Sequence, residues 1–374
     1  DPYKLRVIAA EYGIDTANKK DEELALMLGQ RALSDFGKQD EEPLLFTKRA
    51  PKKQRDLWKS LNIFPRGIDR EVVETLARTH EGMDQDYKNL VQSTMRTSLA
   101  DGWGGSMLAT ELSDILFGSP QPIRAKANLG VLKSDEVNII IHGHEPTLSD
   151  VIVTASQDKE LIELAKSKGA KGITIAGICC TANEILVRRG IPVAGNFLQQ
   201  ELAIFTGAVE AMVVDIQCIM PGIAQAAEHF HTKVISTSLK ARLPGAEHIE
   251  FKESNALDTA KNIIKLAIEN YPNRDKNKVN IPKEAMDLVA GFTAENIFYH
   301  LGGKFRGSYR PLNENIANGR IRGVAGVVGC DNPRMGSGSS HIALVKELIK
   351  NNVLVVQTGC AAIECAKEGL LTPE

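Results

Sequence analysis

Beyond about residue 122 the chain alternates short apolar strands with amphipathic helices, and this pattern restricts the possible folds more than any other feature. The strand-like segments are rich in Val and Ile and show little polar alternation: EVNIIIHG, GITIAGICC, AMVVDIQCIM and KVISTS. Strands that are apolar on both sides are typical of parallel sheets whose two faces are covered by helices. We therefore predict an α/β fold with a doubly wound parallel sheet.

The same pattern divides the chain into three predicted domains. Residues 1–121 carry only helical periodicity, residues 122–270 form a first Rossmann-like α/β domain, and residues 271–374 begin with a polar linker before the alternation resumes. The last domain offers only two clear strands, in IRGVAGVVGC and VLVVQTGC, so we predict a partial Rossmann-like domain. Because the chain also starts without Met and stops just past a helix, we expect a fragment of a longer protein.

Composition argues against two classes of partner. The formal net charge of −2 gives no electrostatic basis for binding nucleic acid or an anionic membrane. No apolar run approaches the ~18 residues that a membrane span needs. Six Cys in 374 residues are too few for a secreted disulfide scaffold, so we expect reduced thiols and a cytoplasmic protein.

Four of the six cysteines share one position relative to the predicted strands. Each lies at or near the carboxyl end of a strand: Cys180, Cys218, Cys330 and Cys360. A further strand is followed by His142 and His144. Because open α/β sheets build their sites at this edge, we predict that four thiols and one or two imidazoles converge on one metal site.

The spacing of these residues favours a cluster over a single zinc ion. Structural zinc sites use closely spaced cysteine pairs, whereas these thiols are far apart in the sequence. Thiolates on separate elements together with an imidazole suit an iron–sulfur or mixed soft-metal cluster, although spacing alone does not name the metal. Of the other two cysteines, Cys179 is predicted to pack behind Cys180, and Cys365 to fill the core from within a helix.

Five motifs, in this order, resemble the nickel–iron carbon monoxide dehydrogenases of the anaerobic type: HGHEPTLSD, GICCTANE, VDIQCIMPG, GVVGCDNP and VVQTGCAA. The resemblance covers essentially the whole chain. It implies an N-terminal helical domain, two Rossmann-like domains and a nickel–iron–sulfur cluster between them. It also implies that His144 and Cys180 bind the iron outside the cubane, and that Cys218, Cys330 and Cys360 each hold one cubane iron.

The implied reaction converts CO and water to CO2, two protons and two electrons, and is reversible. In the family an acid near the site assists a lysine. Asp101, in SLADGWGG, is the candidate for that acid, and a solvated or helix-capping Asp fits the position equally well.

The resemblance also indicates which parts of the enzyme lie outside this sequence. The family's cysteine-rich segment, with additional [4Fe–4S] clusters that bridge a homodimer, precedes the matched region. A nickel-ligating Cys and the catalytic lysine follow it. We therefore expect that this chain alone does not oxidise CO. For the intact enzyme the resemblance implies ferredoxin as electron partner and, as a possible further partner, an acetyl-CoA synthase subunit.

Three other interpretations remain open from the sequence. Hybrid-cluster enzymes of the hydroxylamine reductase type share most Cys placements but need carboxylate ligands, for which no Glu-bearing motif is visible. A nucleotide-dependent dehydrogenase is disfavoured because GVVGCDNPRMGSGSSH lacks GxGxxG. The third is a non-catalytic scaffold or assembly fragment.

Overall fold

The computed structural model of the chain describes residues 1–300, 302, 304 and 307–373. It consists of two units, a first unit Asp1–Ser119 and a second unit Pro120–Glu374. Each unit has its own apolar clusters, and each is described here by itself.

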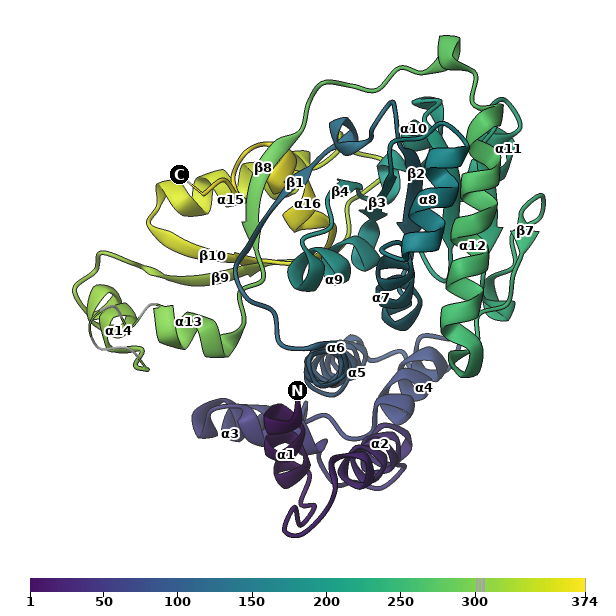
Figure 1. The fold of residues 1–374 in the computed structure, drawn as a ribbon. Helices are drawn as coiled ribbons and strands as arrows, with labels where there is room; N and C mark the ends of the chain where they lie inside the picture. The colour runs from purple at the N-terminus through teal and green to yellow at the C-terminus, as the bar shows by residue number, and fades with distance from the viewer. Residues whose placement is uncertain (301, 303, 305–306, 374) are drawn as a thin grey trace. The chain divides into compact units, whose positions relative to one another are not determined.

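The first unit is built from helices (Figure 1). Their bounds are α1 Pro2–Glu11, α2 Asp21–Gly37, η1 Leu45–Arg49, α3 Lys52–Ser60, α4 Ile68–Arg78, α5 Tyr87–Ala100, η2 Asp101–Ser106 and α6 Met107–Phe117. The Asp-Pro opening starts α1 as the sequence indicates, because the Asp1 side chain accepts the Lys4 N–H and Pro2 occupies the first turn. Leu5 and Ile8 pack with Leu24 of α2 in the largest apolar cluster of this unit.

A π-helical turn, η2, joins α5 to α6, and glycines make it possible. A Cβ on the buried Gly104 would lie 2.8 Å from Ile68 and 2.9 Å from Leu44, so only Gly allows this close approach. Trp103 of the same turn packs edge-on against Trp58, with 5.7 Å between ring centroids. Wide turns of this kind occur frequently at functional sites.

The second unit contains an eight-stranded sheet in the order β7-β6-β5-β2-β3-β4-β1-β8. The strands are β1 Ile123–Ala127, β2 Val137–His142, β3 Ile173–Ile178, β4 Val193–Gly195, β5 Val209–Val214, β6 Lys233–Ser236, β7 Glu247–His248 and β8 Met286–Ala290. All neighbouring strands pair in parallel except β1 and β8, which pair antiparallel. The predicted α/β fold with a parallel sheet is confirmed.

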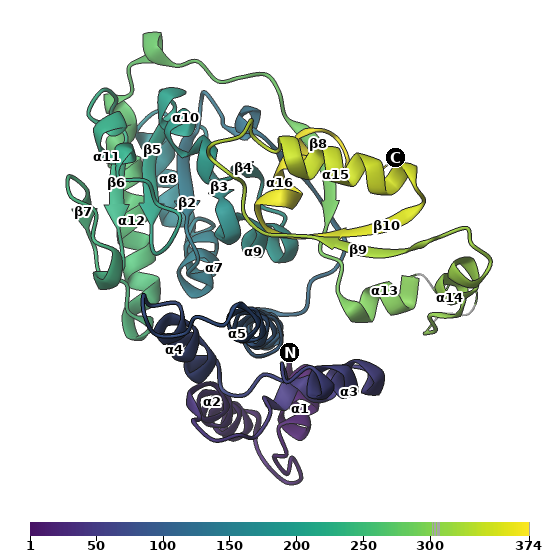
Figure 2. The same ribbon diagram turned by 180° about the vertical axis from the view of Figure 1, so that it is seen from behind.

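Helices cover both faces of this sheet because its central strand is buried at every position. On one face, alternate residues of β2 pack against α7 Pro146–Ala155, α8 Lys159–Ser167 and α12 Ala256–Asn270 (Figure 1). On the other face, Ile140 of β2 packs with α10 Gln200–Phe205 and α11 Gly222–Ala227 (Figure 2). Helix α9 Cys179–Arg189 follows β3 directly.

A second, two-stranded parallel sheet follows in the same unit. It pairs β9 Gly323–Val327 with β10 Val353–Gln357. The helices of this region are α13 Ala294–His300, α14 Arg310–Ala317, α15 Ser339–Lys350 and α16 Gly359–Lys367. Ile363 of α16 packs into a cluster with Ala182 of α9 and Val193 of β4, which joins the two sheets.

Two details of the second unit depend on local caps and distant pairing. Residues 145–169 form two helices, α7 and α8, because Asp158 caps a new helix by accepting the Glu160 N–H. Strand β8, from the segment after the predicted linker, joins the edge of the large sheet by pairing with β1. The proposed domain limits at residues 121 and 270 stay predictions.

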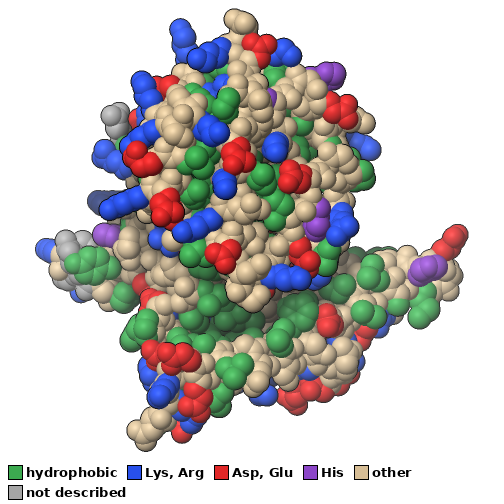
Figure 3. Space-filling model, turned by 45° about the vertical axis from the view of Figure 1, so that its right-hand side comes forward, with side chains coloured by type: hydrophobic (Ala, Val, Ile, Leu, Met, Phe, Trp, Pro, Cys, Tyr) green, Lys and Arg blue, Asp and Glu red, His purple; other side chains and the backbone are tan. Residues whose placement is uncertain are grey.

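The surface carries charges of both signs. On the face in Figure 3, Lys and Arg side chains are interspersed with Asp and Glu. Such mixing produces no large field of one sign on that face. Within the described part of the chain, no helix has both the length and the apolar character needed to cross a bilayer.

Candidate metal centre

Three neighbouring strands of the large sheet end at the candidate site. Strand β2 is followed by His144, β3 by Cys179 and Cys180, and β5 by the segment that ends at Cys218. Because β2 pairs with β3 on one side and β5 on the other, the three strand ends are adjacent. The structure therefore brings three of the predicted ligands to one edge, where α/β folds place their sites.

His144 has the orientation of a metal-binding histidine. Its Nδ1 donates to the Ile216 carbonyl at 3.0 Å, and its Nε2 lies 3.9 Å from Cys218 Sγ. Burial lowers the pKa of the imidazole, but hydrogen bonds with Cys180 and Cys218 outweigh this effect and raise the pKa to about 11. A histidine that donates one ring N–H to a carbonyl presents its other nitrogen in a fixed direction, as metal ligands do.

Asp215 holds the loop that carries His144. This buried carboxylate accepts the N–H groups of His144 at 2.7 Å and Glu145 at 3.1 Å, and also that of Ile216. Burial raises the pKa of Asp215, although these backbone hydrogen bonds oppose the shift. Gly143 makes the contact possible, because a Cβ there would lie 1.9 Å from Asp215 Oδ1.

Cys179 lies behind the site rather than in it. It is fully buried in the apolar cluster under the sheet, and its Sγ lies 3.9 Å from Cys360 Sγ. Hydrogen bonds to Cys218 and Cys360 raise its pKa, whereas the same contacts lower the pKa of Cys218, to about 4, and that of Cys360. Cys179 thus remains a thiol whose single S–H is shared between two thiolates, in agreement with its predicted packing role.

The second sheet supplies the other two predicted ligands from its carboxyl ends. Cys330 follows β9, and Cys360 lies in the first turn of α16 after β10. Cys360 is buried in the same cluster as Cys179, whereas Cys330 is exposed. Burial and the nearby thiols Cys360, Cys218 and Cys180 raise the pKa of Cys330, so it belongs to the same group as its outermost member.

Hydrogen bonds of Glu364 link the two-stranded sheet to the large sheet close to these thiols. Its carboxylate accepts from Asn196 Nδ2 at 2.6 Å, from Ser337 Oγ at 3.0 Å and from Lys367 Nζ at 2.8 Å. Asn196 follows β4 of the large sheet, Ser337 lies in the loop after Cys330, and Glu364 is on α16. Sequence reasoning missed both Glu364 and Asp215, although a polar residue directly after the apolar strand β5 was a visible signal.

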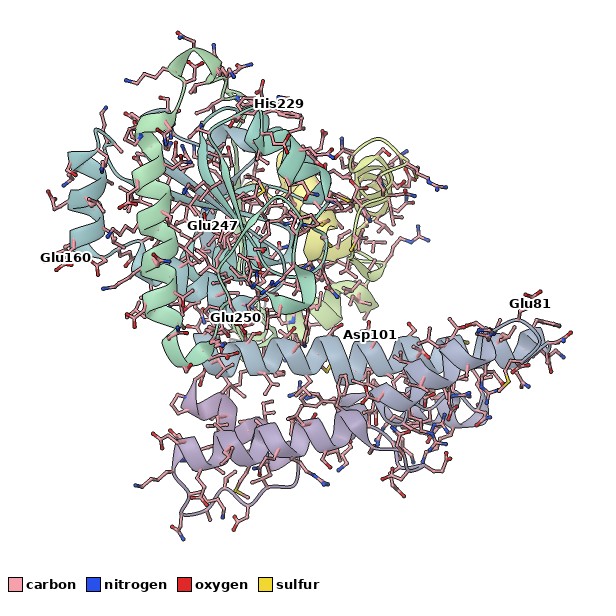
Figure 4. The ribbon with its side chains drawn as sticks, turned by 90° about the vertical axis from the view of Figure 1, so that its right-hand side faces the viewer. Glu81, Asp101, Glu160, His229, Glu247 and Glu250 are labelled. Atoms are coloured by element: carbon pink, nitrogen blue, oxygen red, sulfur yellow. The ribbon has the colours of Figure 1, made fainter. Side chains whose placement is uncertain are left out.

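Asp101 lies in the first unit, where it is exposed at the start of η2 (Figure 4). Its Oδ1 lies 3.3 Å from the position of a Cβ on Gly105, within its own turn. Its role as an acid stays a prediction.

Within the described ranges, no group of three or more His, Cys, Asp or Glu side chains is arranged to hold one metal ion. The chemistry of the donor set suits an iron–sulfur cluster. The thiols come from separate strand ends around His144, and two have pKa values lowered toward the thiolate. Several thiolates from separate elements are the donors of iron–sulfur clusters.

Comparison with known proteins agrees with this arrangement. The profile of the Prismane/CO dehydrogenase family matches residues 1–374. The chain belongs to this family. It is 56% identical over 374 residues to carbon monoxide dehydrogenase 1 of Methanosarcina acetivorans, covering 100% of this chain and 59% of that protein. It is 43% identical to the carbon monoxide dehydrogenase/acetyl-CoA synthase subunit beta of Moorella thermoacetica, covering 56% of it.

Solved structures of the family have the same fold. A carbon monoxide dehydrogenase from Thermococcus sp. AM4, nickel-free as isolated and produced without the CooC maturase, aligns with a TM-score of 0.95 at 51% identity. The alignment covers 100% of this chain and 58% of that one. The chain thus spans somewhat more than half the length of these relatives.

Proposed function

We propose that this chain is the cluster-holding core of a carbon monoxide dehydrogenase. One observation carries the proposal: the chain is 56% identical, over its full length, to an enzyme of that name. The 3.9 Å separation of His144 Nε2 and Cys218 Sγ, with Cys330 near enough for these groups to affect its pKa, supports it. His144 and Cys180 would hold the iron outside the cubane. Cys218, Cys330 and Cys360 would each hold one cubane iron.

When bound, the nickel–iron–sulfur cluster supplies the two-electron oxidation of CO with water to CO2 and two protons. The residues of this chain set the conditions for that chemistry. Hydrogen bonding to Ile216 fixes the direction of the His144 ring, and the apolar cluster around Cys179 and Cys360 excludes water from one side. Asp101 is proposed as the acid that assists proton transfer.

The partners of the complete enzyme belong to the same proposal. Electrons would pass through additional [4Fe–4S] clusters of a homodimer to ferredoxin, in the cytoplasm. An acetyl-CoA synthase subunit is the further partner we propose. Support comes from the Moorella relative, which is named as a subunit of a carbon monoxide dehydrogenase/acetyl-CoA synthase.

Anaerobic reconstitution of the purified chain with iron, sulfide and nickel tests the proposal. We expect about four irons per chain and a broad absorption near 400 nm, as for a cubane cluster held by thiolates. The variant Cys218→Ser should lose iron, whereas Cys365→Ser should keep it, since Cys365 is a buried core thiol outside the site.

Three results would contradict parts of the proposal. Equal iron loss in both Ser variants would show that the strand-end thiols are not special. No iron uptake by the wild-type chain would contradict the cluster-holding role. CO-dependent reduction of a viologen dye by this chain alone would overturn the expectation that the chain alone does not oxidise CO.

A further inference from the structure

The turn that carries Cys218 has an unusual backbone. Gln217 and Cys218 follow one another with φ of 62° and 60°, the left-handed region that favours glycine. Two consecutive non-glycine residues adopt this conformation only where the surroundings hold them in it. The contacts around the turn identify what holds it.

One side chain, Gln200, forms hydrogen bonds to the chain on both sides of Ile219, and we call this set of contacts the bracket. Gln200, the first residue of α10, is fully buried. Its Nε2 donates to the Cys218 carbonyl at 3.3 Å, and its Oε1 accepts the Met220 N–H at 2.9 Å. A second donation from Nε2, to Phe197 O at 2.6 Å, anchors the carboxamide to its own helix start. The amide therefore bonds to the chain on both sides of Ile219.

His142, the last residue of the neighbouring strand β2, also contacts the Cys218 carbonyl and belongs to the bracket. Its Nε2 lies 3.1 Å from the Cys218 carbonyl and 3.2 Å from Gln200 Oε1. Both neighbours are acceptors, so Nε2 carries the hydrogen and donates to both. The Cys218 carbonyl thus receives two hydrogen bonds from fully buried side chains. Of the two, only Gln200 also reaches Met220.

We infer that Gln200 is a positioning residue for the metal centre, because it fixes the left-handed turn that directs Cys218 Sγ toward His144. The inference rests on the proposed function, since Cys218 is a ligand only if the cluster binds there. The 3.9 Å separation of Cys218 Sγ and His144 Nε2 depends on this turn. Gln200 itself touches no metal and no substrate.

Two variants and one control test the role. Gln200→Met keeps the side-chain length and removes all four hydrogen bonds of the carboxamide, including the one that it accepts from His142. Gln200→Glu keeps an acceptor for Met220 but loses the donor to Cys218. Gln225→Met makes the same change at an exposed position of α11 and is the matched control.

The first measurement needs no cluster. In the metal-free chain, iodoacetamide labelling resolved by mass spectrometry should show Cys218 reacting about tenfold faster in Gln200→Met than in wild type, because loss of the bracket opens the turn. Gln200→Glu should fall between them, and Gln225→Met should match wild type. A wild-type rate at Cys218 in a folded Gln200→Met chain would overturn the inference.

The second measurement is a spectroscopic signature. After anaerobic reconstitution, the reduced Gln200→Met cluster should show shifted EPR g-values, which a purely structural loss of stability would not produce. If wild type takes up no iron, the proposed function fails while the labelling result still decides the turn.

If neither Gln200 variant folds, hydrogen exchange on the wild-type chain decides. Strong protection of the Met220 amide supports the bracket, and rapid exchange there refutes it.

Discussion

Position 143 requires a positive φ and has no room for a Cβ beside Asp215, and replacing Gly143 by Ala tests both requirements. Gly143 has φ of 139°, a conformation that L side chains rarely adopt, at the end of β2 beside His144. A Cβ here would also lie 1.9 Å from Asp215 Oδ1 and 2.4 Å from its Cγ. The variant must therefore strain the backbone and displace the carboxylate that accepts the His144 and Glu145 N–H groups.

The expected loss of stability follows from these contacts. Backbone strain in this region costs about 1–3 kcal/mol. Each of the two part-buried N–H groups that loses its acceptor adds up to about 1–3 kcal/mol. The free energy of unfolding of the second unit should fall by roughly 3–9 kcal/mol, much of the ~5–15 kcal/mol that a domain has.

Gly169→Ala is the matched control. Gly169 also has a positive φ, 93°, but an added Cβ would meet nothing within 4 Å. Its replacement by Ala should therefore cost only the strain, about 1–3 kcal/mol. The difference between the two variants measures the Asp215 contact.

Urea unfolding followed by pulsed alkylation of Cys365 provides the assay, because Cys365 is fully buried in the second unit. Both tryptophans, Trp58 and Trp103, lie in the first unit, so their fluorescence reports whether that unit still folds. Equal destabilisation by Gly143→Ala and Gly169→Ala, within about 0.5 kcal/mol, would refute the reasoning.

Three carboxylates give further predictions. Glu71→Gln should destabilise the first unit by about 3–5 kcal/mol in urea, read by tryptophan fluorescence, because the fully buried Glu71 carboxylate pairs with Arg66 at 2.8 Å and with Arg96 at 3.3 Å; a loss under about 1 kcal/mol would contradict this. Burial raises the pKa of Glu74, but arginine hydrogen bonds lower it overall, so its contribution to stability is present above pH 4.5 and lost as pH falls below that value. Glu74→Gln should therefore flatten the acid side of the stability profile. Glu364→Ala should speed hydrogen exchange in α16 about tenfold or more, since Asn196 loses its acceptor; unchanged exchange would argue against this fastening.

The sequence was sufficient for the fold class because long apolar strands with flanking helices allow few arrangements. It was insufficient for short elements. Strand β4 has three residues, and β8 pairs with β1 across more than 150 positions of the chain, so neither leaves a local periodic signal. The break between α7 and α8 depends on one cap, Asp158, in an otherwise helical pattern.

The candidate site likewise combines residues that could be predicted from the sequence with residues that could not. Strand-end position could be read from the sequence, and it led to Cys180, Cys218, Cys330 and Cys360 together with His144. The residues that hold these side chains could not be found this way. Gln200 lies in a helix start and reaches Cys218 only because α10 packs under β5, a tertiary contact that no local pattern encodes. Asp101 lies in the first unit, and its role as an acid stays a prediction.

The strand ends at the candidate site share one backbone feature. Every strand end that carries a predicted ligand contains a residue with positive φ: Gly143, Cys179, Cys218, Gly329 and Gly359. A left-handed residue after a strand turns the chain sharply, so that its own side chain or the next one faces the sheet edge. At three ends Gly adopts the turn without strain. At Cys179 and Cys218 a side chain must be held in it, at about 1–3 kcal/mol each. These two residues are also joined by a hydrogen bond that lowers the pKa of Cys218. The strained backbone therefore lies at the two thiols that form this hydrogen bond.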